Sequence, residues 1–367
     1  MPTLGVIAGD GVGPEVIAEA LAVLDLVGRG GPTIDRIPFD LGAERYLRTG
    51  EVLPDAELAR LRACDAILLG AVGDPRVPPG VLEQGLLLRL RFAFRQNINL
   101  RPIRLYPGVE TPIRGKVPAQ IDMAVVRENN EDLYVGAGGF TYKGTADEVA
   151  IQTSINTRRG VDRCLKFAFE LARERAKLRP FAGLSEADRA AGKVGLVTMV
   201  AKTNVLTYAH DLWMRAFREM AVGYPDIAAD YQHVDACCMR MVISPERFDV
   251  IATTNMFGDI LTDLGAVLQG GMGVAASGNL NPERTAPSMF EPVHGSAPDI
   301  AGKGIANPIA AILSVALLLD FLEASGPAGR VRDAVARVLA EGTPRTPDLG
   351  GSASTAEVGR AVRKVLG

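Results

Sequence analysis

Residues 255–263 read NMFGDILTD; they follow a predicted apolar strand and open a predicted helix. Because a helix stacks side chains four residues apart, Asp259 and Asp263 share one face, where their carboxylates repel each other unless a cation neutralises them. Oxygen ligands suit Mg²⁺ or Mn²⁺, and Asp235, beside the end of another predicted strand, is a third candidate ligand. A solvated acidic helix face is the alternative interpretation of the same spacing.

Apolar strands alternate with helical patterns along the rest of the chain. The predicted strands are residues 4–8, 34–38, 66–69, 122–127, 194–199, 228–234 and 248–253, with a Gly-rich, hairpin-like stretch at 136–144. The predicted helices begin at residue 14, lie at 53–64, 81–95 and around 161–172, follow residue 204, and cross 257–268. This alternation predicts an α/β fold with a largely parallel sheet and helices on its faces. Two lobes are expected, since the 367 residues exceed the roughly 250–300 that one core spans.

The charge balance argues against nucleic acid and membrane partners. With 43 acidic and 40 basic residues, the formal net charge is -3, so no global field attracts a polyanion, and a small-molecule partner is expected. The four cysteines show no paired spacing and the start of the chain lacks a basic signal-peptide segment, which predicts a reducing, cytoplasmic location. The longest apolar stretch, residues 309–319, is shorter than the roughly 18–20 residues of a membrane span, and we expect a buried helix there.

A Gly-rich turn at residues 9–14 (GDGVGP) follows a strand and opens a helix, as a dinucleotide-binding fingerprint does. Its spacing differs, because the sixth position is Pro14 and the acidic residue at about the right distance, Asp35, lies inside the second predicted strand. We therefore interpret the segment as a plain strand-to-helix turn with Pro at the first helical position. A cofactor is then expected to bind elsewhere.

Three arginines, a tyrosine and a lysine are candidates for substrate chemistry. Arg91, Arg101 and Arg127 lie on a predicted helix or at predicted strand ends, where guanidinium groups can clamp a dicarboxylate. Tyr134 is a candidate proton donor. Lys202 follows a buried strand, where desolvation favours the neutral amine that a general base requires. Surface charges and a half-buried aromatic are the alternatives for these residues.

The segment at residues 291–308 (EPVHGSAPDIAGKGIANP) is a long Gly/Pro-rich loop before a helix. Long loops in compact domains are usually functional, and backbone N–H groups at small residues can receive phosphates. Asp299 is an acceptor that suits a ribose diol and disfavours a 2′-phosphate. A plain connector is the alternative. Residues 181–192 break the apolar period and are interpreted as a surface insertion without a catalytic role.

In this order, the NMFGDILTD and EPVHGSAPDIAGKGIANP segments resemble the β-decarboxylating hydroxyacid dehydrogenases, the family of isocitrate, 3-isopropylmalate, homoisocitrate and tartrate dehydrogenases. The resemblance runs from the turn at 9–14 to the last helices. It implies a two-lobed α/β subunit with a long mixed sheet flanked by helices, and not a Rossmann fold. Residues 1–98 and 271–367 would form a discontinuous large lobe, and residues 99–270 the second lobe with the dimer contacts.

The resemblance also implies the site. Arg91, Arg101 and Arg127 would bind the substrate carboxylates, and Tyr134 and Lys202 would be the acid and the base. The implied metal ligands for Mg²⁺ or Mn²⁺ are Asp235, Asp259 and Asp263, with Asp235 also contacting substrate. The implied NAD-binding residues are Glu291, His294, Gly295, Ser296, Ala297, Asp299, Ile300 and Asn307. Asp299-Ile300 resembles the NAD-preferring pattern, because NADP-using relatives carry a Lys-Tyr pair there. A homodimer is implied, in which the neighbouring chain supplies Lys202 and Asp235 to each site; a tetramer is the alternative assembly.

The helix at residues 83–91 resembles the isopropylmalate type, which implies 3-isopropylmalate as substrate and a place in leucine biosynthesis. The residues implied to face the isopropyl group are Glu83, Leu87, Leu88 and Val205. Tartrate, D-malate, isocitrate and homoisocitrate are alternatives, because Ala201 and residues 127–131 depart from the commonest isopropylmalate pattern. A non-catalytic regulatory subunit is a remote alternative, since such subunits lose metal or base residues that this chain retains.

Overall fold

The computed structural model describes residues 2–28 and 34–367. The chain divides into two compact units: unit 1 comprises Met1–Gln96, Arg101–Ile121 and Gly265–Gly367, and unit 2 comprises Asn97–Leu100 and Asp122–Leu264. The sequence-based division placed residues 99–270 in the second lobe.

Residues 101–121 belong to unit 1, and their hydrogen bonds join them to other residues of this unit. The backbone N–H of Leu105 donates to the carbonyl of Ile121 at 2.9 Å. The backbone N–H of Arg104 donates to Gln269 Oε1 at 2.8 Å. Both partners are unit 1 residues, and β4 (Ile98–Arg104) therefore carries residues of both units.

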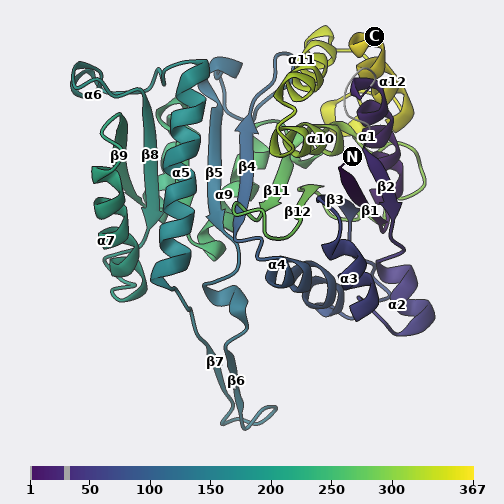
Figure 1. Cartoon of the computed structure of the whole chain (residues 1–367), viewed down its shortest axis with the longest axis horizontal. Helices are drawn as coiled ribbons and strands as arrows, with labels where there is room; N and C mark the ends of the chain where they lie inside the picture. Colours follow the sequence, from purple (N-terminus) through teal and green to yellow (C-terminus); the bar gives the residue numbers. More distant parts are fainter. Residues whose placement is uncertain (1, 29–33) are drawn as a thin grey trace. The chain divides into compact units, whose positions relative to one another are not determined.

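Unit 1 contains a mixed sheet in the order β2-β1-β3-β12-β11 (Figure 1). Its strands are β1 (Thr3–Gly9), β2 (Asp35–Pro38), β3 (Ala66–Ala71), β11 (Ala276–Leu280) and β12 (Ser288–Pro292). Its helices are α1 (Gly13–Val27), α2 (Ala43–Thr49), α3 (Asp55–Arg62), η1 (Glu83–Leu88), α4 (Arg89–Ala93), η2 (Pro118–Gln120), η5 (Met272–Val274), α10 (Ile309–Phe321), α11 (Ser325–Glu341), η6 (Pro347–Leu349) and α12 (Thr355–Leu366). All its pairings are parallel except the antiparallel pair of β11 and β12.

Unit 2 contains parallel strands in the order β5-β10-β8-β9. These are β5 (Asp122–Glu128), β10 (Val250–Thr253), β8 (Gly195–Ala201) and β9 (Ile227–His233). The other elements are η3 (Leu133–Val135), β6 (Gly138–Thr141), β7 (Val149–Gln152), α5 (Arg158–Leu178), α6 (Glu186–Ala190), α7 (Ala209–Val222), α8 (Val234–Ile243), η4 (Pro245–Arg247) and most of α9 (Asn255–Leu268). Antiparallel β6 and β7 form a hairpin that extends away from the rest of this unit (Figure 1).

The predicted α/β fold, with a mixed sheet flanked by helices, is confirmed. Helix α5 shows why the apolar period predicts these elements: Val161, Leu165 and Phe169 are fully buried and pack toward β5, β8 and β10. Figure 1 shows α5 running along these strands. Helix α10 is buried along nearly all its length, as predicted for residues 309–319.

Several local predictions need correction. The helix predicted at 81–95 is present, but it ends at Ala93 and its middle part, η1, is a π-helix that α4 continues. The segment predicted as a surface insertion, 181–192, is largely exposed, but it contains a helix that was not predicted, α6, whose N-cap Ser185 accepts the N–H of Asp188 at 3.1 Å. Helix α2 was not predicted, because it has only 7 residues before Gly50 ends it in the left-handed conformation. None of the described helices combines the length and apolar character needed to span a bilayer.

Candidate active site

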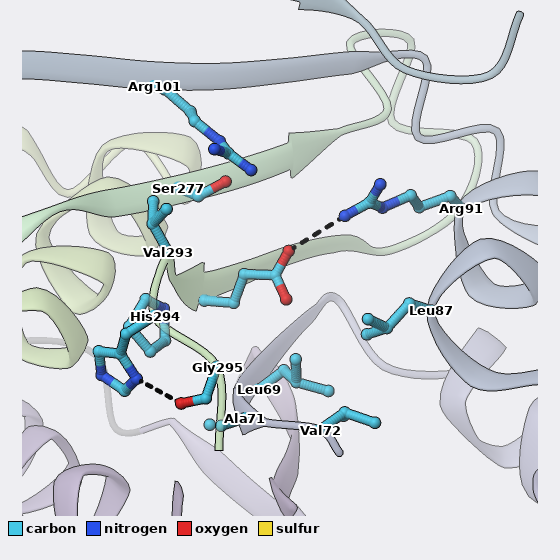
Figure 2. A pocket seen from close by; sticks show the side chains of 13 residues that line it. Leu69, Ala71, Val72, Leu87, Arg91, Arg101, Ser277, Val293, His294 and Gly295 are labelled. Carbon is cyan, nitrogen blue, oxygen red and sulfur yellow. Dashed lines mark hydrogen bonds and ion pairs between the residues drawn. The ribbon is translucent and has the colours of Figure 1, made fainter. Parts of the chain in front are cut away.

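A pocket in unit 1 gathers several of the predicted site residues (Figure 2). Arg91 of α4 and Arg101 of β4 extend toward it from different elements. The remaining lining residues are Leu69, Gly70, Ala71, Val72, Leu87, Ser277, Glu291, Pro292, Val293, His294 and Gly295. Two guanidinium groups beside an apolar wall suit an anionic ligand that also carries an aliphatic group.

Glu291 fixes the Arg91 guanidinium. Its Oε1 atom lies 3.5 Å from Arg91 Nη2, and the two side chains are only 11% and 10% exposed. The same oxygen accepts a hydrogen bond of 2.6 Å from Asn279 Nδ2. A buried pair of this kind costs desolvation and holds its geometry through the extra hydrogen bond. Glu291 was predicted to contact the cofactor, and its observed partners are Arg91 and Asn279.

His294 presents a neutral ring beside this pocket. Burial lowers the pKa of His294 from its ordinary value of 6.5. Its Nδ1 atom lies 3.0 Å from the Gly295 carbonyl (Figure 2); because a carbonyl only accepts, Nδ1 carries the proton and Nε2 is an acceptor. Within residues 2–28 and 34–367, the buried Nε2 atom has no hydrogen-bond partner. The ring therefore offers an open acceptor and an uncharged face to a ligand.

The turn at residues 9–14 packs directly on this loop. The N–H of Val12 donates to the Ser296 carbonyl at 2.8 Å. Gly11 has a φ of +57°, and a Cβ atom there would lie 1.9 Å from the Ser296 oxygen, so only glycine fits. The turn precedes α1 as predicted, but the helix begins at Gly13, so Pro14 is its second residue and not its first. Sequence reasoning missed its contact with the loop, which joins segments far apart in the sequence.

Asp10, within this turn, is a further residue that sequence reasoning missed. Its side chain is buried and accepts two backbone hydrogen bonds, from Ala43 at 2.8 Å and from Gly73 at 2.9 Å. Burial raises the pKa of the Asp10 carboxyl from its ordinary value. The carboxylate thus joins the turn to the start of α2 and to the loop after β3, which lies beside the pocket.

Replacing Asp10 with alanine is expected to lower the free energy of unfolding by about 3 kcal/mol, because a buried N–H group, that of Ala43, and a partly buried one, that of Gly73, lose their acceptor. Urea unfolding followed by circular dichroism measures this change. The matched control is Asp40→Ala, which removes an exposed pair with Arg48 and should change the stability by less than about 1 kcal/mol. Equal losses in the two variants would refute the role of Asp10.

Asn307 and Asp299 occupy different environments in the loop. Asn307 is buried, donates from Nδ2 to Asp348 at 3.0 Å, and accepts the N–H of Ile309 at 3.0 Å, which fixes the entry into α10. Asp299 is exposed and Ile300 half-buried. Ala297 has a φ of 40°, and its carbonyl accepts the N–H of Ile300. The loop is therefore fixed at both ends and exposes Asp299.

In unit 2, Arg127 connects β5 to α9. The residue is 1% exposed, and its Nε and Nη2 atoms donate to Asn255 Oδ1 at 3.0 and 2.7 Å. Its Nη1 donates to Asp259 Oδ1 at 2.5 Å, while the Tyr134 hydroxyl donates to Asp259 Oδ2 at 2.7 Å. The guanidinium carbon also lies 5.2 Å from the Tyr134 ring centroid. Three of the predicted site residues thus form one hydrogen-bonded group.

The turn that carries Tyr134 is held by acidic side chains. Buried Glu128 accepts the N–H groups of Asn130 and Glu131 at 2.9 and 2.7 Å, and burial raises the pKa of Glu128 to about 7. Asp132 accepts the N–H of Met256, at the start of α9, at 3.0 Å. The phenol is therefore positioned by contacts to both β5 and α9.

Lys202 and Asp235 form a second group in unit 2. They follow the neighbouring strands β8 and β9, and Lys202 Nζ donates to Asp235 Oδ1 at 2.7 Å. The hydrogen bond from Lys202 lowers the pKa of the Asp235 carboxyl. The Lys202 side chain is 25% exposed and that of Asp235 is 65% exposed, so both reach solvent.

The predicted metal ligands do not come together within one chain. Asp259 and Asp263 lie on α9, and the Asp235 carboxylate is bound to Lys202. Across the described ranges 2–28 and 34–367, no group of three His, Cys, Asp or Glu residues could hold a metal ion. The chemistry of the α9 pair fits Mg²⁺ or Mn²⁺, since both ligands are carboxylates and Asp259 is already oriented by Arg127 and Tyr134. A third ligand must then come from elsewhere.

Of the residues predicted for the apolar wall, Leu87 lines the pocket. Leu88 is half-buried, Glu83 is exposed, and Val205 is 63% exposed.

Comparison with known proteins gives consistent matches. The family model of isocitrate/isopropylmalate dehydrogenases matches residues 3–362. The 3-isopropylmalate dehydrogenase of Thermobifida fusca is 54% identical over 357 residues, covering 97% of this chain and 95% of the relative. That of Mycobacterium tuberculosis is 54% identical, covering 95% and 97%. The crystal structure of isocitrate dehydrogenase from Methylococcus capsulatus has a TM-score of 0.85 at 35% identity, covering 100% and 99% of the two chains.

Proposed function

Because this chain belongs to the isocitrate/isopropylmalate dehydrogenase family, we propose that it is a 3-isopropylmalate dehydrogenase that oxidises its substrate with NAD and removes the β-carboxylate. The product is 2-oxoisocaproate, and the reaction is a step of leucine biosynthesis. The observation that carries this proposal is the identity of 52–55% to proteins named 3-isopropylmalate dehydrogenase, over nearly the full length of both chains.

The unit 1 pocket supports this choice of substrate. Arg91 and Arg101 supply two guanidinium groups for carboxylates, and Leu69, Val72 and Leu87 supply apolar surface for an isopropyl group. Arg127 is the third proposed carboxylate ligand. Leu88, Val205 and Glu83 remain proposals for the apolar wall.

NAD and a divalent cation are the proposed cofactors. The neutral His294 ring and the exposed Asp299 suit an adenosine that lacks a 2′-phosphate. Asp259 and Asp263 would hold Mg²⁺ or Mn²⁺ together with Asp235 of a second copy of the chain. When bound, NAD accepts the hydride and the cation stabilises negative charge that develops on the substrate oxygens.

The proposed site residues have separate roles in the reaction. The arginines orient the diacid through its carboxylates. Lys202, or a water that it activates, accepts the proton of the 2-hydroxyl group, and Asp235 holds the Lys202 amine in position. The Tyr134 hydroxyl protonates the carbon that loses CO₂. Its hydrogen bond to Asp259 orients it for this step.

The proposed assembly is a homodimer in which each site receives Lys202 and Asp235 from the other chain. The hairpin of β6 and β7 exposes Phe140, Tyr142 and Ile151 by 58%, 68% and 59%. On α8, Met239 and Ile243 are 64% and 66% exposed. Exposed apolar side chains gathered on a projecting hairpin and a helix are typical of protein interfaces, and a second copy would bury them.

Replacing Ile151 with aspartate is expected to shift the protein toward monomers and to lower its activity at least 10-fold at low protein concentration, because a buried unpaired charge opposes association. Sedimentation velocity measures the oligomeric state, and NADH production the activity. Leu178→Asp, at a side chain 90% exposed at the end of α5, is the matched control. A dimer that persists in Ile151→Asp would contradict the proposed interface.

The proposed reaction is tested by NADH or NADPH production with Mg²⁺ and five substrates: 3-isopropylmalate, D-malate, tartrate, isocitrate and homoisocitrate. We expect kcat/KM with NAD to be at least roughly 100-fold higher for 3-isopropylmalate than for the others. A preference for another diacid would overturn the assigned substrate. Inactivity with all five would favour the regulatory-subunit alternative.

A further inference from the structure

The backbone amide of Lys202 is bound by a histidine side chain. The N–H of Lys202 donates to His210 Nδ1 at 2.6 Å. His210 is 2% exposed and lies in the first turn of α7, and its ring meets Phe257 of α9 edge-on, with the centroids 5.4 Å apart. The geometry of the imidazole is therefore fixed on two sides.

This hydrogen bond requires an unprotonated Nδ1. A backbone amide can only donate, so His210 accepts through Nδ1, and its neutral ring carries the proton on Nε2. Burial lowers the pKa of His210 from its ordinary value of 6.5, which favours the neutral form at neutral pH. Protonation would place two N–H groups against each other and break the contact.

The hydrogen bond from Lys202 to His210 lies in a turn that further hydrogen bonds stabilise. The Lys202 carbonyl accepts the N–H of Leu206 at 2.9 Å, and the Leu206 carbonyl accepts the N–H of His210 at 3.0 Å. The next residue, Thr203, is held through its N–H and its hydroxyl by the Tyr231 hydroxyl, at 3.2 and 2.8 Å. The His210 contact is therefore the bond that fixes the amide of Lys202 itself.

We propose that His210 is a positioning residue for Lys202: its neutral imidazole holds the amide of Lys202 and thereby aims the Lys202 amine. This inference rests on the proposed function, in which Lys202 is the base. His210 contacts neither substrate nor cofactor in this role. It acts through the direction of the Lys202 side chain toward Asp235.

The charged groups around the ring define the expected pH response. Asp132, from the turn after β5, favours the protonated ring, but burial outweighs it. On α7, Asp211 is paired with Arg215, and the Lys202 amine is paired with Asp235. Since burial lowers the pKa of His210 from its ordinary value, the ring becomes protonated only in a more acidic range than a free histidine does. Activity should therefore fall on acidification, as the ring releases the Lys202 amide.

Two conservative variants distinguish the effect of the hydrogen-bond acceptor at Nδ1 from the effect of the volume of the ring. In His210→Asn, the Oδ1 atom occupies the place of Nδ1 and can still accept the Lys202 N–H. In His210→Gln, the amide reaches the place of Nε2 instead, and the acceptor is lost. We expect His210→Asn to retain kcat within about 3-fold and His210→Gln to lose about 30-fold in kcat, because small misplacements of a catalytic group are costly.

The measurements are kcat and KM for 3-isopropylmalate between pH 5 and 9, thermal unfolding, and hydrogen exchange at the Lys202 amide. In His210→Gln, we expect the Lys202 amide to exchange faster and KM for NAD to stay unchanged. In His210→Asn, we expect kcat to decrease less on acidification than it does in the wild type. Equal kcat losses in the two variants, or a protected Lys202 amide in His210→Gln, would overturn the inference. The exchange result is independent of turnover, so an inactive wild type would contradict only the proposed function.

Discussion

Replacing Lys202 with methionine is expected to lower kcat with 3-isopropylmalate by about 10³-fold, within the range that general acid–base catalysis contributes. Methionine keeps an unbranched side chain and removes the amine that donates to Asp235. Because the substrate carboxylates are assigned to arginines, KM for the diacid should change far less than kcat. Steady-state NADH production measures both constants.

Lys193→Met is the matched control for this substitution. Lys193 precedes β8, as Lys202 follows it, and its amine donates to the Ile227 carbonyl at 3.2 Å. The control should retain activity within about 2-fold, since it removes one partly exposed hydrogen bond. A Lys202→Met variant that keeps more than a tenth of the wild-type kcat would mean that another group takes the hydroxyl proton.

Mixing two inactive variants tests whether Lys202 acts in the site of the neighbouring chain. If the protein forms the proposed homodimer with shared sites, Lys202→Met and Arg127→Ala, unfolded and refolded together, should regain about a quarter of the wild-type activity, because half of random dimers are mixed and each mixed dimer holds one intact site. No recovery, with mixed dimers verified by mass spectrometry, would place Lys202 and Arg127 of one chain in the same site.

The regular elements could be predicted because their signals are local. The apolar period of α5 predicts its buried face, with Val161 and Leu165 inward. The Gly-rich stretch at 136–144 predicts a hairpin, of which it contains β6, while the second strand, β7, lies beyond it. The limits of the two units were harder to predict. They depend on pairings such as that of Leu105 with Ile121, and the apolar pattern of a strand does not identify its partner.

Much of the site depends on contacts between distant segments. Residues such as Arg91 and Arg101 could be proposed because guanidinium groups at strand and helix ends are typical of diacid sites. Asp10 and His210 could not, because a buried carboxylate or imidazole reveals its partner only in three dimensions. The same holds for Gly258, whose position against Arg127 is set by the packing of α9 on β5.

Replacing Arg127 with lysine is expected to lower kcat/KM for the diacid by about 10³-fold and the free energy of unfolding by about 3 kcal/mol. The guanidinium makes two hydrogen bonds to Asn255 and one to Asp259. A lysine amine cannot reproduce this planar fork, and Asn255, fully buried, would keep an unsatisfied oxygen. Enzyme assays and urea unfolding measure the two effects; near-wild-type activity would show that a positive charge alone suffices.

Gly258→Ala tests the same arrangement without changing Arg127. A Cβ atom at Gly258 would lie 2.4 Å from Arg127 Cγ, so the arginine must move. We expect a loss of at least about 30-fold in kcat/KM, since Arg127, the proposed ligand of a substrate carboxylate, would be displaced. Gly329→Ala, in α11 with no atom near its Cβ, is the control and should gain up to about 1 kcal/mol from helix propensity. If Gly258→Ala also gained stability and kept its activity, the packing of α9 against Arg127 would not determine the geometry of the site.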